Sequence, residues 1–432
     1  MKRSGSFLLL ALSFLTACSG GGGADNATPS PVSPLPPPST APYLLDATTR
    51  SLAAPAVPGA IADTAIACTV TLHQDQACTL GQLPLLGMQT LSPDIDAVMA
   101  RTIVTHSWMA TRFRELLALM PPEILLLMRG LTAVVISSEI RPSFYTTRTG
   151  AIYLDPAGMW LTEAERAVIS TREDPRAEDI RAFQFLINWR YVDNESNINT
   201  APRSLESLRL RLAALLYHEL AHANDYFPPD RLGQLDTTVP IYGNVSSLAL
   251  PSTALSNALP LQSSQMKALA AAAFLGVTPT AALLQTTPAE VATEFPLDVA
   301  NDYYNYATPR EDLAMAFEEA MMLHSFGVQR DVAVTSYPPD VAFCDDLVVH
   351  WGQRNRIAEL AIGARSLLVV ERILPESAAA IELMLANLVA PVQMRPGQGW
   401  CENIVLDEST RSLSIVPELP IEGQVEFLPL AH

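Results

Sequence analysis

The spacing of apolar and polar residues predicts strands early in the chain and helices later. Apolar residues recur near the helical period over 95–130, with a break at Pro121-Pro122. Residues 132–140 and 151–155 are short runs rich in β-branched and aromatic side chains, which is typical of strands. Further helical patterns lie at 162–170, 176–190, 265–276, 288–295, 309–325, 354–373 and 376–389. We therefore predict an α+β fold, in which a small mixed sheet is followed by a mostly helical part.

The segment 204–226 carries the strongest helical pattern of the chain. Ser204 is a typical N-cap residue, and an apolar stripe follows it, formed by Leu205, Leu208, Leu212, Leu215, Leu216 and Leu220. The stretch 228–263, by contrast, is rich in proline and small polar residues and has no periodicity. A segment of that length without regular structure is often a functional loop or lid.

The first residues are typical of a secretory signal. Lys2 and Arg3 precede an apolar run over 7–15, which is too short to span a bilayer because a spanning helix needs about 20 residues. The sequence Leu15-Thr16-Ala17-Cys18 then resembles the lipobox of bacterial lipoproteins, in which the cysteine becomes the lipidated N-terminus. We expect a signal peptide over 1–17; the alternative is an unlipidated signal with a chance cysteine.

The residues that follow predict a tether. The chain is rich in Gly, Ser and Pro up to about residue 44, and such a segment buries too little apolar surface to fold. We expect 18–44 to comprise the lipidated Cys18 and a disordered linker. Ser19 follows the cysteine where Asp would suggest retention in the inner membrane of bacteria, so the lipoprotein resemblance implies anchoring in the cell envelope, at the outer membrane.

The charge balance argues against a nucleic-acid partner. The chain has 45 Asp and Glu against 27 Lys and Arg, a formal net charge of −18, whereas nucleic-acid binding calls for basic patches. An acidic surface is otherwise a normal route to solubility, and the sequence does not indicate an oligomeric state.

Four cysteines remain after Cys18. They are Cys68, Cys78, Cys344 and Cys401, and an even number in an exported chain indicates disulfides. Of the three possible connectivities, the simplest joins Cys68 to Cys78 and Cys344 to Cys401. A four-cysteine zinc site is the alternative, but the chain lacks the C-x-x-C spacing that such sites use.

The central motif is His218-Glu219-Leu220-Ala221-His222. Residues four apart lie on one face of a helix, so both imidazoles can share one tetrahedral Zn²⁺, with Glu219 beside its open position. A glutamate so placed can act as the general base for a zinc-bound water. The alternative is a helix with two incidental histidines, although histidine is scarce, with 7 in the chain. The motif predicts one zinc ion per chain.

At this motif the chain resembles the zincin metallopeptidases. The resemblance implies a fold in which the motif helix lies beneath a small sheet, here supplied by 132–140 and 151–155, whose edge strand pairs with extended substrate. The form H-E-x-x-H-x-x-D occurs in several gluzincins, including the lethal-factor-like group, and implies that Asp225 orients a ligand histidine. A polar residue at the end of the helix is the alternative role for Asp225. The metzincin form fails, because positions 225 and 228 are Asp and Pro.

A third ligand is expected from the later helix, 309–325. Glu311 begins the segment EDLAMAF, which resembles the E-x-[FL]-A-x-x-F form of the lethal-factor-like gluzincins, whose first glutamate binds zinc. In those proteins a tyrosine precedes it, so Tyr306 is expected to assist catalysis, with Tyr304 as the other candidate. Thr308-Pro309-Arg310-Glu311 also fits a capping box, which leaves a purely structural role open for Glu311, and Glu318 is the next candidate ligand.

The sequence thus predicts a lipid-anchored zinc metallopeptidase of gluzincin type that hydrolyses protein or peptide substrates. Residues 45–227 would form an α/β part with the motif helix, and 228–432 a mainly helical part that supplies the third ligand. The competing hypothesis is a non-catalytic lipoprotein of zincin-like fold with a binding or envelope-assembly role. A zinc hydrolase with a non-peptide substrate remains a third possibility.

Overall fold

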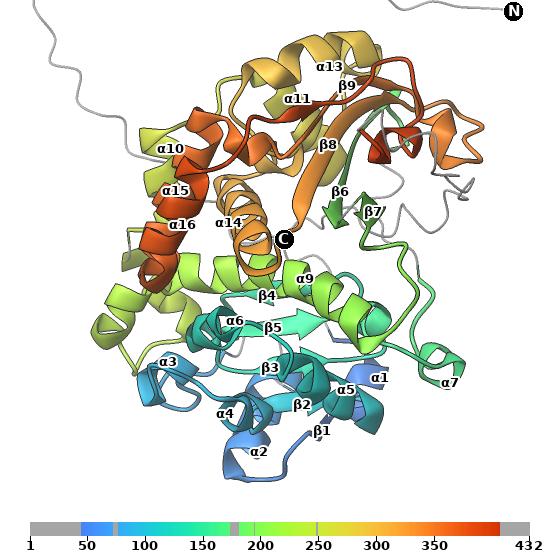
Figure 1. Cartoon of the computed structure of the whole chain (residues 1–432). Coiled ribbons are helices and arrows are strands. Elements are labelled where there is room, and N and C mark those ends of the chain that lie inside the picture. The colour runs from blue at the N-terminus through green and yellow to red at the C-terminus, as the bar shows by residue number, and fades with distance from the viewer. Residues whose placement is uncertain (1–44, 72–76, 173–180, 194, 248, 407–432) are drawn as a thin grey trace, which may run out of the picture. The chain divides into compact units, whose positions relative to one another are not determined.

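A computed structural model describes residues 45–71, 77–172, 181–193, 195–247 and 249–406. The predicted signal peptide, the lipidated Cys18 and the tether over 18–44 lie outside the described residues. The described residues form a single unit with an α+β fold and two separate sheets (Figure 1).

The first sheet is mainly parallel and carries an antiparallel strand at its edge. Its strands follow the order β1-β2-β3-β5-β4. They are β1 (Ala54–Pro55), β2 (Thr102–Val104), β3 (Val134–Ile136), β4 (Phe144–Thr146) and β5 (Ala151–Leu154). β2, β3 and β5 are parallel to one another, and β4 pairs antiparallel to β5. Every residue of β2, β3 and β5 is buried, which explains their nearly continuous apolar runs, since parallel strands are covered on both faces.

Short helices surround this sheet. They are α1 (Ala47–Leu52), α2 (Ala60–Ile66), α3 (Leu86–Gln89), α4 (Ile95–Met99), α5 (Ser107–Leu117), α6 (Pro122–Leu127) and α7 (Glu163–Arg166). The predicted strands over 132–140 and 151–155 are confirmed as β3 and β5. The predicted helical region over 95–130 is confirmed too, although Thr102–Val104 within it forms a strand.

The second sheet is antiparallel throughout and was largely missed by the sequence pattern. Its order is β10-β9-β8-β6-β7. Its strands are β6 (Phe185–Asp193), β7 (Ser196–Asn197), β8 (Gln329–Ser336), β9 (Val349–Arg354) and β10 (Val392–Gln393). The helix predicted over 176–190 is wrong where the chain is described, because β6 begins at Phe185. The prediction of a mostly helical part after 228 overlooked β8, β9 and β10.

Two long helices lie between the sheets. α9 (Leu205–Tyr226) begins after the predicted N-cap Ser204, whose side chain accepts from the Ser207 N–H, and α14 (Pro309–Phe326) packs against it. Figure 1 shows α9 above the first sheet, next to edge strand β4, with α14 on its other side. Gly130 allows a close approach to α9, since a Cβ there would lie 3.1 Å from the backbone of Ala223.

The remaining helices are α10 (Pro251–Ala258), α11 (Ser264–Phe274), α12 (Ala281–Leu284), α13 (Pro288–Glu294), α15 (Leu360–Ile373) and α16 (Ala378–Ala386). Of these, α11, α13, α15 and α16 fall within predicted helical segments or extend a residue beyond them, whereas α10 and α12 were not predicted. The segment predicted as an irregular loop over 228–263 contains the short turns Pro229–Gln234 and Ile241–Ser247 and then α10, which packs against α14. No helix among the described residues is both long and apolar enough to cross a membrane.

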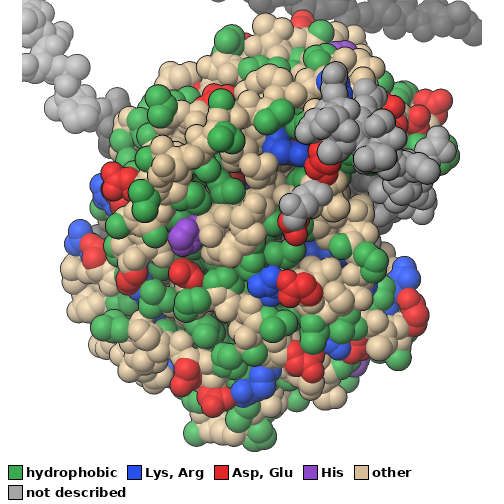
Figure 2. Space-filling model, in the orientation of Figure 1, with side chains coloured by type: hydrophobic (Ala, Val, Ile, Leu, Met, Phe, Trp, Pro, Cys, Tyr) green, Lys and Arg blue, Asp and Glu red, His purple; other side chains and the backbone are tan. Residues whose placement is uncertain are grey.

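Both predicted disulfides form. Cys68 pairs with Cys78 near the first sheet, and Cys344 pairs with Cys401, which joins the segment before β9 to the described end of the chain. On the surface, Figure 2 shows acidic and basic side chains interspersed with apolar ones over one face of the molecule.

Candidate metal centre

The motif helix presents both histidines to α14. His218 and His222 lie one turn apart on α9, on the face that meets α14, and only 5% and 3% of their surfaces are exposed. Leucines such as Leu216 and Leu220, also buried, pack α9 into the core. The orientation of the histidines therefore follows from the helical period and from packing of the apolar stripe.

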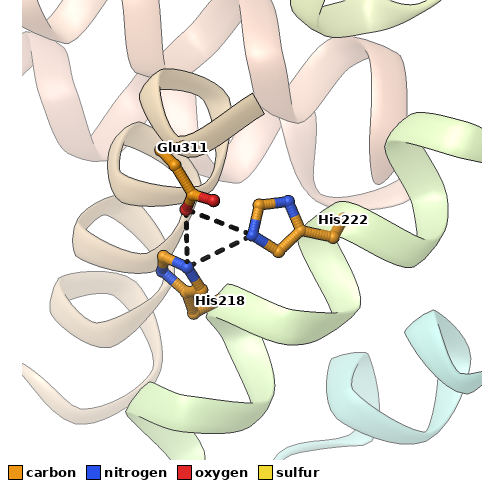
Figure 3. Close-up of side chains that lie close together, drawn as sticks. All are labelled: His218, His222 and Glu311. Atoms are coloured by element: carbon orange, nitrogen blue, oxygen red, sulfur yellow. Dashed lines mark hydrogen bonds and ion pairs between the residues drawn. The ribbon is translucent and has the colours of Figure 1, made fainter. Parts of the chain in front are cut away.

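Glu311 reaches the histidines from the first turn of α14. Thr308 caps this helix, and its hydroxyl accepts a hydrogen bond from the Glu311 N–H at 3.2 Å. The Glu311 carboxylate points to the two histidines (Figure 3). Only the Thr308 half of the predicted capping box is present, because the Glu311 side chain, which would form the other half, points to the histidines.

The three donor atoms form a nearly equilateral triangle. Oε2 of Glu311 lies 3.2 Å from Nε2 of His218 and 3.3 Å from Nε2 of His222, and the two nitrogens are 3.3 Å apart (Figure 3). Zinc bonds to nitrogen and oxygen are about 2.0–2.2 Å long, so one face of a zinc tetrahedron has edges of about 3.3–3.6 Å. Among the described residues these three side chains form a group able to hold a metal ion.

Glu318 holds the other nitrogen of His218. The Nδ1–H group of His218 donates to Oε2 of Glu318 at 3.1 Å, and Oε1 of Glu318 accepts from the Tyr191 hydroxyl at 2.9 Å. Arg330 lies 3.5 Å from that same Oε1 and pairs with Asp302 at 2.6 Å. Glu318, the second candidate ligand from sequence, therefore lies behind His218 and supports it. The histidine keeps Nε2 directed at the donor triangle.

The charges of the site favour a cation. Burial alone would lower the pKa of His218, but the carboxylates of Glu311 and Glu318 outweigh it and raise that pKa to about 10. Burial would conversely raise the pKa of Glu311, yet the nearby His222 and His218 hold it well below its usual value. Without a metal the site therefore binds a proton tightly, and a divalent cation at the triangle would replace it.

Glu219 and Asp225 occupy different surroundings on α9. Glu219 is buried, and its charge is close enough to contribute to the raised pKa of His218. Asp225 is also buried, and its Oδ1 accepts the backbone N–H of Ser252 at 2.7 Å. Asp225 thus attaches α10 to the end of the motif helix; its predicted role in orienting a ligand histidine stays a prediction.

Of the two candidate tyrosines, Tyr304 lies at the site. Its ring stacks on the imidazole of His218, with ring centres 6.1 Å apart. Tyr306 instead packs edge-on against Phe295 at 6.3 Å, and burial together with the charge of Asp298 raises its pKa. The structure thus places Tyr304, the other candidate, against the ligand histidine, and a catalytic role for either tyrosine stays a prediction. Residues 304–306 form a 3₁₀ turn of about three residues, so side chains two apart point in different directions.

Sequence reasoning missed the supporting residues from the second sheet. Tyr191 lies on β6 and Arg330 on β8, and neither strand was predicted. No local motif marks them, since each is linked to the metal centre through its contact with Glu318.

Comparison with known proteins found no matching family model, and neither a curated protein nor a solved structure matches the chain.

Proposed function

We propose that this chain is a zinc-dependent metallopeptidase of zincin type, anchored in a bacterial envelope through lipid on Cys18. His218, His222 and Glu311 would bind one Zn²⁺. The observation that carries the proposal is the donor triangle with edges of 3.2–3.3 Å, formed by two neighbouring helices and adjoined by Glu219. The triangle leaves one of the four positions of a tetrahedral ion to a water molecule, as catalytic zinc sites require.

The residues around the triangle have distinct roles in such a reaction. Bound zinc would lower the pKa of its water and polarise the carbonyl of the scissile peptide bond. Glu219 would accept the proton of that water and pass it to the departing amine. Tyr304, which lies against His218, would donate a hydrogen bond to the oxyanion that forms at the attacked carbonyl.

The arrangement of the first sheet supports a peptide substrate. β4 is an edge strand that contacts α9, and it runs antiparallel to β5. An edge strand offers backbone groups to an extended peptide, and such pairing near the motif helix is what the resemblance to zincins implies.

One observation favours the competing hypothesis of a non-catalytic protein. His218, Glu219, His222 and Glu311 are each at least 95% buried. A zinc site so enclosed could stabilise the contact between α9 and α14 without meeting a substrate. The glutamate at 219 argues for catalysis, because a structural zinc site has no need of a general base.

The deciding experiment compares the full chain with its Glu219→Gln variant. We expect both proteins to contain one zinc per chain by elemental analysis, and only the parent to cleave a peptide library followed by mass spectrometry. Glu206→Gln, on the exposed first turn of the same helix, is the matched control and should cleave normally. A zinc-loaded parent that hydrolyses no peptide would favour the binding protein.

A further inference from the structure

Arg310 is a basic residue at the metal centre that the proposed mechanism does not use. It directly precedes Glu311 in the first turn of α14, and its guanidinium carbon lies 4.9 Å from the centre of the Tyr226 ring. Tyr226 follows His222 by one turn of α9. Both Arg310 and Tyr226 are partly exposed, whereas the histidines are buried. Arg310 is therefore a partly exposed cation that adjoins a proposed metal ligand in the chain.

Ring contacts connect Arg310 to the edge strand. Tyr226 stacks on Tyr145 of β4, with ring centres 6.0 Å apart. The Tyr145 hydroxyl is buried and has no hydrogen-bond partner among the described residues. Arg310, Tyr226 and Tyr145 thus form a continuous wall, which we call the Arg310 wall, from the third ligand to the strand expected to pair with substrate.

The guanidinium of Arg310 is available for a ligand. Its Nε has no hydrogen-bond partner, and no carboxylate pairs with the side chain within the described part of the chain. Some other arginines contact an acid: Arg330, Arg354 and Arg365, all buried, each contact an aspartate.

The nearest acid does not neutralise Arg310. Asp225 is close enough for the Arg310 charge to oppose the effect of burial, which raises the pKa of Asp225. However, Asp225 is fully buried and accepts from Ser252. A guanidinium presents a planar fork of N–H donors that matches a carboxylate, and its hydrogen bonds are stronger where water is partly excluded.

We propose that Arg310 binds a carboxylate of the substrate, supplied by a free C-terminus or by an acidic side chain near the scissile bond. This inference rests on the proposed metallopeptidase function and adds the substrate class to it. The Arg310 wall would hold that carboxylate beside the metal centre, with the aromatic rings supporting the flanking part of the peptide.

The test measures peptide binding separately from cleavage. The full chain, zinc-loaded and carrying Glu219→Gln to prevent turnover, is titrated with fluorescent octapeptide libraries in matched pairs. One pair compares a C-terminal carboxylate with a C-terminal amide, and the other compares Glu and Asp with Gln and Asn in amidated peptides. We expect tighter binding of the carboxylate member of one pair, which identifies the source of the carboxylate.

Substitution of Arg310 should remove this preference. Losing a charge-assisted pair corresponds to about a tenfold to hundredfold loss in affinity for the carboxylate peptides in Arg310→Gln, with the neutral peptides unaffected. Arg310→Lys should lose part of the preference for carboxylate peptides, because lysine keeps the positive charge but lacks the planar pair of N–H donors. Arg209→Gln is the matched control: Arg209 also lies 4.9 Å from an aromatic ring, that of Phe326, and its loss should leave the preference intact.

The outcomes separate the two proposals. The parent in these titrations is the Glu219→Gln protein. The role of Arg310 would be overturned if the parent showed no preference for carboxylate peptides, or if Arg310→Gln kept the same preference. Either result would count whether or not the wild-type chain cleaves peptides. Carboxylate-dependent binding that needs Arg310, in a chain that cleaves no peptide, would support the carboxylate site and refute the peptidase. Zinc content equal to that of the parent shows that each variant is folded at the site.

Discussion

At the scale of single residues, Glu311 and Glu318 show how two similar side chains on one helix acquire different roles. Both are buried carboxylates on α14, and both contact His218. Glu311 faces Nε2 and Glu318 faces Nδ1. Since a carboxylate on Nδ1 holds the proton there, it leaves the Nε2 lone pair free for a metal and keeps the ring in place.

We predict that Glu318→Gln weakens zinc binding without abolishing it. The amide cannot hold the Nδ1–H group as strongly, and loss of such support typically costs about tenfold to a hundredfold in metal affinity. Competition with a chromophoric zinc chelator measures this directly.

The neighbouring Glu319 provides the control for that prediction. It is buried on the same helix but accepts from Asn301 at 2.7 Å. Glu319→Gln should therefore bind zinc as the parent does. Unchanged affinity in Glu318→Gln would mean that the contact with His218 does not support the metal.

At the scale of elements, the start of α14 joins helix capping to ligand placement. Thr308 accepts from the Glu311 N–H, which positions the first turn of the helix, and the Glu311 side chain then projects toward α9. The motif T-x-x-E therefore predicts the N-cap of the helix correctly. It does not predict the direction of the Glu311 side chain, which depends on how α14 packs against α9.

The two functions of this turn can be separated by substitution. Thr308→Ala should lower the free energy of unfolding by about 1 kcal/mol, as loss of an N-cap does, and retain zinc. Glu311→Ala should lose zinc, because two histidines alone do not complete the site. Urea denaturation and elemental analysis of both variants measure the two effects. Zinc retained at full occupancy in Glu311→Ala would assign Glu311 to the cap alone.

Two of the strands that the sequence pattern missed, β6 and β8, share a physical cause. β6 carries the buried Arg190, and β8 carries the buried Arg330 and Asp331. Charged residues at buried positions hide the apolar pattern of a strand, and they are tolerated here because Arg190 and Arg354 both pair with Asp331. Such pairing depends on strands far apart in the chain.

At the scale of the whole molecule, buried polar contacts connect the second sheet to α14 and to the metal centre. Arg330 links β8 to Glu318, and Asn301 links the segment before α14 to Glu319. Burial raises the pKa of Glu319 to about 7, although the charge of Arg330 and the hydrogen bond from Asn301 act in the opposite direction. Between about pH 4.5 and pH 7, Glu319 therefore keeps its proton in the folded protein. In the unfolded chain it loses that proton near its ordinary pKa of 4.5.

This buried proton predicts a pH dependence of global stability. Because the folded pKa is the higher one, the contribution of Glu319 is fully present below about pH 4.5 and is lost as the pH rises to about 7. The pKa difference corresponds to about 3 kcal/mol. Relative to the parent, Glu319→Gln should therefore become more stable by up to about that amount between pH 4.5 and pH 7.

Urea denaturation at a series of pH values, with zinc removed from all samples, measures this difference. The exposed Glu206→Gln should follow the parent at every pH. A constant difference between Glu319→Gln and the parent across this range would show that Glu319 is ionised in the folded protein throughout.

The sequence by itself determined the features that depend on local geometry. The helix after Ser204, the parallel projection of His218 and His222, and the capped start of α14 follow from helical period and capping, which involve residues a few positions apart. The simplest pairing of the four later cysteines was also the one that forms.

Only the tertiary structure decided which distant groups meet. It brought Glu311 to the donor triangle and Glu318 behind His218, and it turned Tyr304 rather than Tyr306 toward the site. These choices depend on how α14 and the turn before it pack against α9. That packing is set by contacts in the core between residues far apart in the chain. The spacing of residues along the sequence does not predict which of these residues will meet.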